Sequence, residues 1–300
     1  MQNADDAKAT RFSIIVDERP KSKHDTLRKS LLSEEIDDWQ GPAIWIYNDA
    51  LFTIKDFQAL KKLGTGSKSR DDTKIGRFGI GFNCAFHITD LPSIVSGEHI
   101  AFLDPNAQYL PPQGYPSERH RGTKINFIET KFKERFPDQC YPYEAIEGCD
   151  LSKEFNGTLF RLPLRTLKSA EKSEISNKVV GIREILQRLR NIKGNREMLF
   201  LRNIESCSLY QIRKQDPPQL KWQAQISMSE SCRNKRKSIT DKMQTYQLDI
   251  ERDYVKNKKV ETWLLCTGGH DRVKKVFKEL SYEKQTDLEK FSNEKRLKVI

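Results

Sequence analysis

Glycine spacing is the first feature of this sequence with a chemical meaning. The stretch "KIGRFGIGFN" places Gly76, Gly79 and Gly81 within six residues, directly before an apolar run. Glycines leave main-chain N–H groups uncovered, and free N–H groups at the start of a helix bind anions such as phosphate. Phe78, Ile80 and Phe82 would anchor the segment on the core side. The order G-x-x-G-x-G is neither the Rossmann nor the P-loop pattern, so a glycine-rich turn without a ligand explains this motif alone equally well.

Oxygen-bearing side chains near the N-terminus suggest a place for a metal ion. In "QNADDA", Asn3 and Asp6 lie one helical turn apart and share a face. An amide oxygen beside phosphates suits magnesium, which prefers oxygen ligands and keeps most of its water molecules. A polar helix surface is the alternative interpretation of this pair.

A carboxylate at the end of an apolar strand could recognise a purine base. The segment "AIWIYNDALF" predicts a buried strand that ends near Asp49. A carboxylate there could accept a hydrogen bond from an exocyclic amino group such as that of adenine. A capping aspartate is the alternative, and for each of the three motifs taken singly the structural alternative is preferred.

Taken together and in this order, the motifs resemble the nucleotide site of the superfamily of gyrase, heat-shock chaperone, histidine kinase and mismatch-repair ATPases. The chain is more closely similar to the sacsin family, and the similarity covers nearly its whole length. It rests on "QNADDA", "QGPAIWIYNDALFT", "DTKIGRFGIGFN", "FLDP", "NGTLFRLPLRT", "LFLRNIESCSLY" and "TWLLCTG". The resemblance implies an ATP-binding domain of a chaperone or co-chaperone type of protein, with ATP and Mg²⁺ as ligands and other chaperones or clients as partners.

The resemblance also implies roles for individual residues. Asn3 would hold magnesium and phosphate, with Asp6 nearby, and Asp49 would recognise the adenine amino group. Thr158, in the Gly157-Thr158 motif, would support the adenine end. The "GT" of "RGTKINF" mimics this motif, but the context "GTLFRLPLR" fits the family better. The phosphates would be enclosed by a lid over residues 64–74 and by the start of the following helix, with Gly76, Phe78, Gly79, Gly81 and Phe82.

Two departures from the family pattern bear on activity. The family helix reads Glu-x-x-x-Asn, and with Asn3 as its asparagine the glutamate that activates water would precede residue 1. We therefore expect a fragment with weak or absent hydrolysis and assign no catalytic residue. The adenine motif Asp-x-Gly-x-Gly lacks both glycines after Asp49, so we expect low affinity for ATP. A non-catalytic scaffold that binds chaperones, with a degenerate pocket, is the alternative function.

The elements that must position these residues form a mixed pattern. Strands are predicted at residues 11–18, 43–52, 93–104 and 157–165, and helices at residues 53–64 and 176–192. This pattern predicts an α+β fold. The resemblance implies a two-layer α/β sandwich of the Bergerat (histidine-kinase-like ATPase) type over residues 1–165. Residues 166–300 would form part of a second, middle-type α/β domain.

Composition narrows the class of protein. The 300 residues carry a net charge of +11, and the positive excess belongs to the second half. Its clearest basic run is "CRNKRKSITDK" (residues 232–242), for which we prefer a solvated loop over a nucleic-acid contact. The six cysteines form no CxxC pair, and no signal peptide or membrane span is visible. We therefore predict a reduced, cytoplasmic protein without bound nucleic acid or membrane.

Overall fold

The computed structural model describes residues 1–21, 30–60, 81–112, 120–144, 146–191, 195–214, 216–238, 244–254 and 257–267. The chain divides into two compact units. The first contains residues 1–192 and 209–220, and the second contains residues 193–208 and 221–300. Residues 166–192 are thus grouped with the first unit. The domain boundary expected between residues 165 and 166 stays a prediction.

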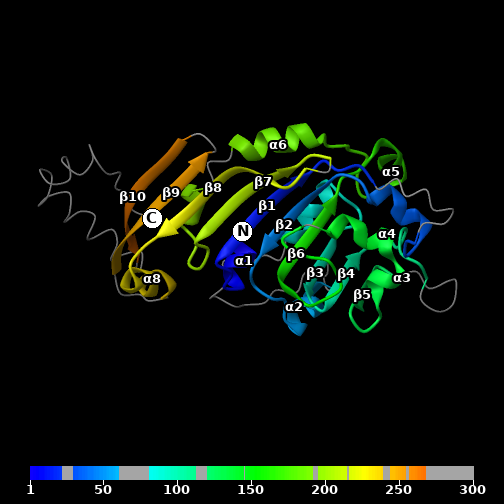
Figure 1. Ribbon diagram of the computed structural model, residues 1–300, viewed down its shortest axis with the longest axis horizontal. Coiled ribbons are helices and arrows are strands. Elements are labelled where there is room, and N and C mark those ends of the chain that lie inside the picture. Colours follow the sequence, from blue (N-terminus) through cyan, green and yellow to red (C-terminus); the bar gives the residue numbers. More distant parts are fainter. Residues whose placement is uncertain are drawn as a thin grey trace, which may run out of the picture. The chain divides into compact units, whose positions relative to one another are not determined.

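The first unit combines a β-sheet with helices, as expected from the alternation of strand and helix patterns (Figure 1). Its strands follow the spatial order β7, β1, β2, β6, β3, β4, β5. Their bounds are β1 (Arg11–Asp17), β2 (Ala43–Asn48), β3 (Ser93–Gly97), β4 (His99–Leu103), β5 (Gly122–Asn126), β6 (Phe155–Pro163) and β7 (Ser206–Ile212). The border with the second unit crosses β7 and β8 (Gln219–Ser227). The strands predicted from alternating apolar residues are therefore confirmed, with β2 ending at Asn48.

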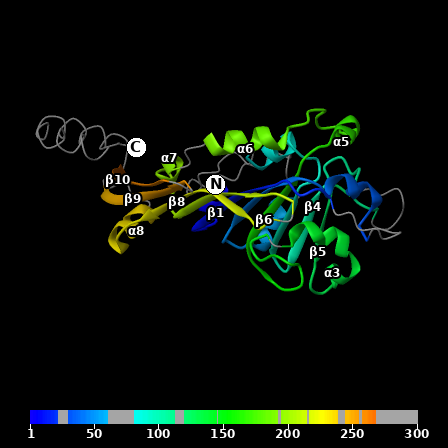
Figure 2. The same cartoon turned by 45° about the horizontal axis from the view of Figure 1, so that its top comes forward.

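Short helices accompany these strands. They are α1 (Gln2–Asp6), η1 (Glu34–Trp39), α2 (Ile54–Leu60), η2 (Gly81–His87), α3 (Phe132–Arg135), α4 (Pro137–Cys140), η3 (Tyr141–Tyr143), α5 (Leu167–Lys172) and α6 (Ile182–Asn191), where η marks a 3₁₀ helix. The helix predicted at residues 176–192 begins only at Ile182. It lies beside the sheet (Figure 2), and Arg190 donates to the Gln211 side chain of β7 at 3.2 Å.

Aromatic side chains fill the core on one face of the sheet. Trp45 on β2 meets Tyr143 edge to face, with ring centroids 5.2 Å apart, and Trp39 meets Tyr109 in the same way. All four residues are buried. The indole nitrogen of Trp45 donates to Asp17 at 3.0 Å, so the polar end of this ring is satisfied inside the core. This packing fixes β2, the strand that leads to Asp49.

The described residues of the second unit include antiparallel strands and two short helices. They are the remainder of β8, then β9 (Gln244–Tyr254), β10 (Asn257–Thr267), α7 (Asn195–Met198) and α8 (Glu230–Lys237). The expectation of a solvated loop over the basic run is wrong where the run is described, because α8 covers most of it. Arg236 is buried and donates to the carbonyl oxygens of Met198, Leu201 and Ile204. Arg236 is therefore part of the buried interior of this unit, where it satisfies three main-chain carbonyl groups.

Candidate functional site

Asp49 extends the hydrogen-bond ladder between β1 and β2. The last paired residues of these strands are Phe12 and Asn48. Beyond them, Oδ1 of Asp49 accepts the main-chain N–H groups of Thr10 at 2.8 Å and Arg11 at 3.0 Å. Oδ2 accepts the hydroxyl of Thr10 at 2.6 Å. The side chain of Asp49 thus takes the place of a main-chain acceptor at the start of β1.

These contacts keep Asp49 ionised. Partial burial opposes ionisation, but the hydrogen bonds from Arg11 and Thr10 outweigh it and hold the pKa of the Asp49 carboxyl below its usual value. The residue is exposed. Asp49 is therefore an accessible anionic acceptor whose orientation is set by β1.

Thr158 belongs to a buried polar network directly behind the segment that follows Asp49. It is paired with Asn48 on β2 and with Ser96 on β3, so the three residues form one row across the sheet. The Thr158 hydroxyl donates to the carbonyl oxygen of Ala50 at 2.7 Å and lies 3.0 Å from the hydroxyl of Ser96. The Ser96 hydroxyl in turn accepts the N–H of Phe52 at 2.9 Å. Thr158 and Ser96 together fix the main chain of residues 50–52.

Gly157, next to Thr158, is required by the close approach of β2. Its φ angle is +143°, a region that residues with a side chain rarely adopt. A Cβ atom there would lie 2.7 Å from the carbonyl oxygen of Asn48 and 2.8 Å from the ring of Tyr47. The Gly-Thr pair therefore combines a tight packing position with the hydroxyl that anchors Ala50.

The helix α1 carries the predicted magnesium ligand. Asn3 is exposed and Asp6 is half-buried, whereas Asp5 is only 1% exposed. The main chain turns back on itself after α1, with the N–H of Ala9 donating to the carbonyl oxygen of Ala4 at 3.0 Å. Because β1 follows at once, α1 lies at the end of β1 where Thr10 meets Asp49 (Figure 1). Asn3, Asp6 and Asp49 thus belong to the same end of the sheet.

The glycine-rich segment falls largely outside the described residues. Gly76, Phe78 and Gly79 lie there, and so does the expected lid over residues 64–74. Gly81 and Phe82 open η2, so a helix does follow the cluster as predicted. Its far end is held by Arg165, which donates to the carbonyl oxygens of Phe86 at 2.6 Å and His87 at 2.8 Å. Whether the glycines hold phosphate stays a prediction.

Comparison with known proteins decides the family. A family model described as the Sacsin domain matches residues 1–224. The chain belongs to the sacsin-domain family. It is 33% identical to sacsin of Homo sapiens over 245 residues, which cover 78% of this chain. The chain spans 5% of the length of human sacsin.

A solved structure is also similar, at a level too low to support an inference. It is the crystal structure of the N-terminal domain of a DNA repair protein, with a TM-score of 0.36 and 12% sequence identity. The match covers 84% of this chain and 63% of the other.

Three side chains of this sacsin domain escaped the sequence-based prediction. Thr10 stands in the short link before β1, Ser96 lies near the end of β3, and Arg165 follows β6. Thr10 and Ser96 carry no signal in one sequence, because their roles depend on which residues of other strands they face. Arg165 follows the mostly apolar stretch "LFRLPL", and a charge at the end of a buried strand hints at an internal partner.

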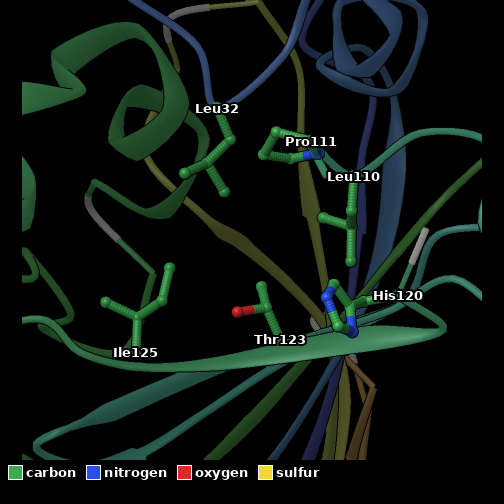
Figure 3. A pocket seen from close by; sticks show the side chains of 6 residues that line it. All are labelled: Leu32, Leu110, Pro111, His120, Thr123 and Ile125. Atoms are coloured by element: carbon green, nitrogen blue, oxygen red, sulfur yellow. The ribbon is translucent and has the colours of Figure 1, made fainter. Parts of the chain in front are cut away.

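A small apolar pocket lies elsewhere in the same unit. It has a volume of about 110 Å³ and is lined by Leu32, Leu110, Pro111, His120, Thr123 and Ile125 (Figure 3). Pockets for small molecules and cofactors generally have a volume of about 300–1,000 Å³. Thr123 belongs to the second Gly-Thr pair, on β5, and strands β3 and β4 separate it from Thr158 on β6. This pair is therefore remote from Asp49.

No helix among the described residues is long and apolar enough to cross a membrane. Within the same residues, no group of three or more His, Cys, Asp or Glu side chains could hold a metal ion by itself.

Proposed function

We propose that the first unit binds Mg-ATP as the nucleotide-binding domain of a chaperone or co-chaperone type of protein, in a Bergerat-type fold. The observation that carries this proposal is the ionised, exposed carboxylate of Asp49 at the end of β2, beside the Ser96–Thr158 network. A carboxylate held at the end of a strand can accept a hydrogen bond from a purine amino group. The order of the motifs in the sacsin-domain family supports the same assignment.

The donor set of the site agrees with a magnesium ion that arrives with the nucleotide. Asn3 offers an exposed amide oxygen and Asp6 a half-buried carboxylate on the same helix. Magnesium keeps several water molecules and is commonly held by one or two protein oxygens together with phosphate oxygens. The ion would screen the phosphate charge. Asn3 would bind the ion and orient it, and the main chain at Gly76, Gly79 and Gly81 would bind the phosphates.

Binding with weak or absent hydrolysis is the activity proposed. Of the carboxylates on α1, Asp5 is buried and Asp6 shares the helix with the proposed magnesium ligand. A general base must reach its water molecule within a hydrogen bond. We therefore assign neither residue to the activation of water.

The proposal is tested by titrating a fluorescent ATP analogue onto the chain with magnesium present. We expect saturable binding, and we expect Asp49→Asn and Asn3→Ala each to weaken it by tenfold or more, since 1.4 kcal/mol corresponds to about tenfold. Asp38→Asn is the matched control, because Asp38 precedes the opposite end of β2 and pairs with exposed Lys168. Absence of binding at millimolar nucleotide would reject the proposal.

A non-catalytic scaffold for other chaperones or clients is the second candidate function. The observation that favours it is that the Asp49 carboxylate already accepts three hydrogen bonds from Thr10 and Arg11, and so has a structural role without any nucleotide. A ligand that binds only the folded state raises the melting temperature. A melting temperature that does not respond to Mg-ATP would therefore favour the scaffold.

A further inference from the structure

The two carboxylate oxygens of Asp49 accept hydrogen bonds from different donor groups. Oδ1 takes two main-chain N–H groups, from Thr10 and Arg11, whereas Oδ2 takes the Thr10 hydroxyl. Each carboxylate oxygen offers about two lone pairs. A further donor, such as a ligand amino group, would therefore meet Oδ2 beside the Thr10 hydroxyl.

We propose that Thr10 is a positioning residue that aims Oδ2 of Asp49 at the amino group of the bound purine, and so sets the preference for adenine. This inference rests on the proposed function. The N–H of Thr10 donates to Oδ1 at 2.8 Å and its hydroxyl donates to Oδ2 at 2.6 Å. Rotation of the Asp49 carboxylate would therefore break both hydrogen bonds. Without the hydroxyl, Oδ2 loses the contact that fixes its direction.

The start of β1 has a second attachment, so loss of the Thr10 hydroxyl alone should leave the strand in place. The guanidinium of Arg11 lies 5.5 Å from the centre of the Tyr47 ring and 3.5 Å from the carboxylate of Glu147. The N–H groups of Thr10 and Arg11 also remain in a valine variant. Thr10→Val therefore tests whether the Thr10 hydroxyl sets the orientation of the Asp49 carboxylate.

The chain supplies a closely matched control. The hydroxyl and N–H of Thr53 both donate to Oδ2 of Asp56 at 2.7 Å, which is again an exposed pairing of threonine with aspartate. Thr53→Val removes a similar hydrogen bond at the start of α2 and leaves Asp49 untouched. Thr10→Ser keeps the hydroxyl and should restore the behaviour of the wild type.

The measurement is the ratio of dissociation constants for Mg-ITP and Mg-ATP. Inosine presents a carbonyl oxygen where adenine presents the amino group, so an acceptor aimed at that position distinguishes the two bases. We expect the wild type to prefer ATP. In Thr10→Val the preference should fall by about five- to tenfold, while Thr10→Ser and Thr53→Val keep it.

The outcomes separate the inference from the proposed function. If the wild type binds ATP and Thr10→Val weakens both nucleotides equally, Thr10 acts only on the strand and the inference is wrong. An unchanged ratio in Thr10→Val would overturn it too. If the wild type binds neither nucleotide, the proposed function is rejected and the inference with it.

Discussion

Arg165 and Asp90 form a buried ion pair at the far end of η2, with the Nε atom of Arg165 2.6 Å from Oδ1 of Asp90. Both side chains are almost fully removed from solvent. The same guanidinium donates to the carbonyl oxygens of Phe86 and His87. Arg165 therefore pairs with a buried carboxylate and also binds the last carbonyl groups of η2, the helix that follows the glycine-rich segment.

Removal of this arginine should destabilise the first unit strongly. Arg165→Ala leaves the buried carboxyl of Asp90 without its cation, and breaking such a pair typically costs about 3–5 kcal/mol. Urea unfolding followed by circular dichroism would measure the loss. Lys168→Ala breaks an exposed pair with Asp38 and should cost less than about 1 kcal/mol. Equal losses in the two variants would contradict this account.

Substitution of Gly157 should be costly for two independent reasons. Its φ of +143° is unfavourable for alanine, and the new Cβ would lie 2.7 Å from the carbonyl oxygen of Asn48. We expect Gly157→Ala to lose at least about 1–3 kcal/mol of unfolding free energy. Gly41→Ala is the control, because a Cβ atom added to Gly41 would have no neighbouring atom within 4 Å. A Gly157→Ala variant as stable as Gly41→Ala would show that β2 and β6 pack less closely here.

The ionised state of Asp49 should appear in the pH dependence of stability. Its folded pKa lies below the unfolded value of 3.8, so its ionisation stabilises the fold above that pH. This contribution is lost as the pH falls through the folded pKa. The difference in unfolding free energy between wild type and Asp49→Asn should therefore be constant well above pH 3.8 and shrink below it. Unfolding curves across the acid range measure it, and a difference that does not change with pH would contradict the prediction.

The cysteines should differ sharply in reactivity. Burial raises the pKa of Cys140, Cys149 and Cys207 to about 12, whereas Cys84 is exposed. The thiolate is the reactive form. In a Cys266→Ser variant, a thiol reagent at neutral pH should label Cys84 and Cys232 within minutes and the other three only on unfolding. Rapid labelling of Cys140 in the folded protein would show that the core opens.

Arg236 should matter for stability although it belongs to a basic run. Its three carbonyl acceptors, on Met198, Leu201 and Ile204, would lose their donor in Arg236→Met. Each unsatisfied buried group costs about 1–3 kcal/mol, so the second unit should be strongly destabilised. Lys237→Ala, next to it and exposed, should leave the unfolding free energy nearly unchanged. Similar stabilities of the two variants would mean that these carbonyls find other donors.

The strands were predictable because their signal is local. Residues 11–18 are rich in β-branched and apolar side chains, and β1 covers Arg11–Asp17. The strand pattern at residues 93–104 is found as the antiparallel pair β3 and β4. The prediction of a solvated loop over the basic run was wrong, because charge alone does not show which arginine points inward. Burial of Arg236 depends on carbonyl groups more than thirty residues earlier in the chain.

The candidate site could be predicted only in outline. Asp49 was identified from its place after an apolar strand, but its bonds to Thr10 and Arg11 follow from the register of β1 on β2. In the same way, Thr158 was implied by the family resemblance, whereas its partner Ser96 is set by the pairing of β3 with β6. Such cross-strand relationships are tertiary, and no local pattern encodes them.

The extension of the β1–β2 ladder by the Asp49 side chain has a consequence for the evolution of related chains. An aspartate at this place holds the first residues of β1 whether or not any purine is bound. Selection for folding alone would preserve it in a descendant that had lost its ligand. In such a descendant Asp49 would act only on the fold, whereas the exposed Asn3 on α1, which stands outside the ladder, would be free to change.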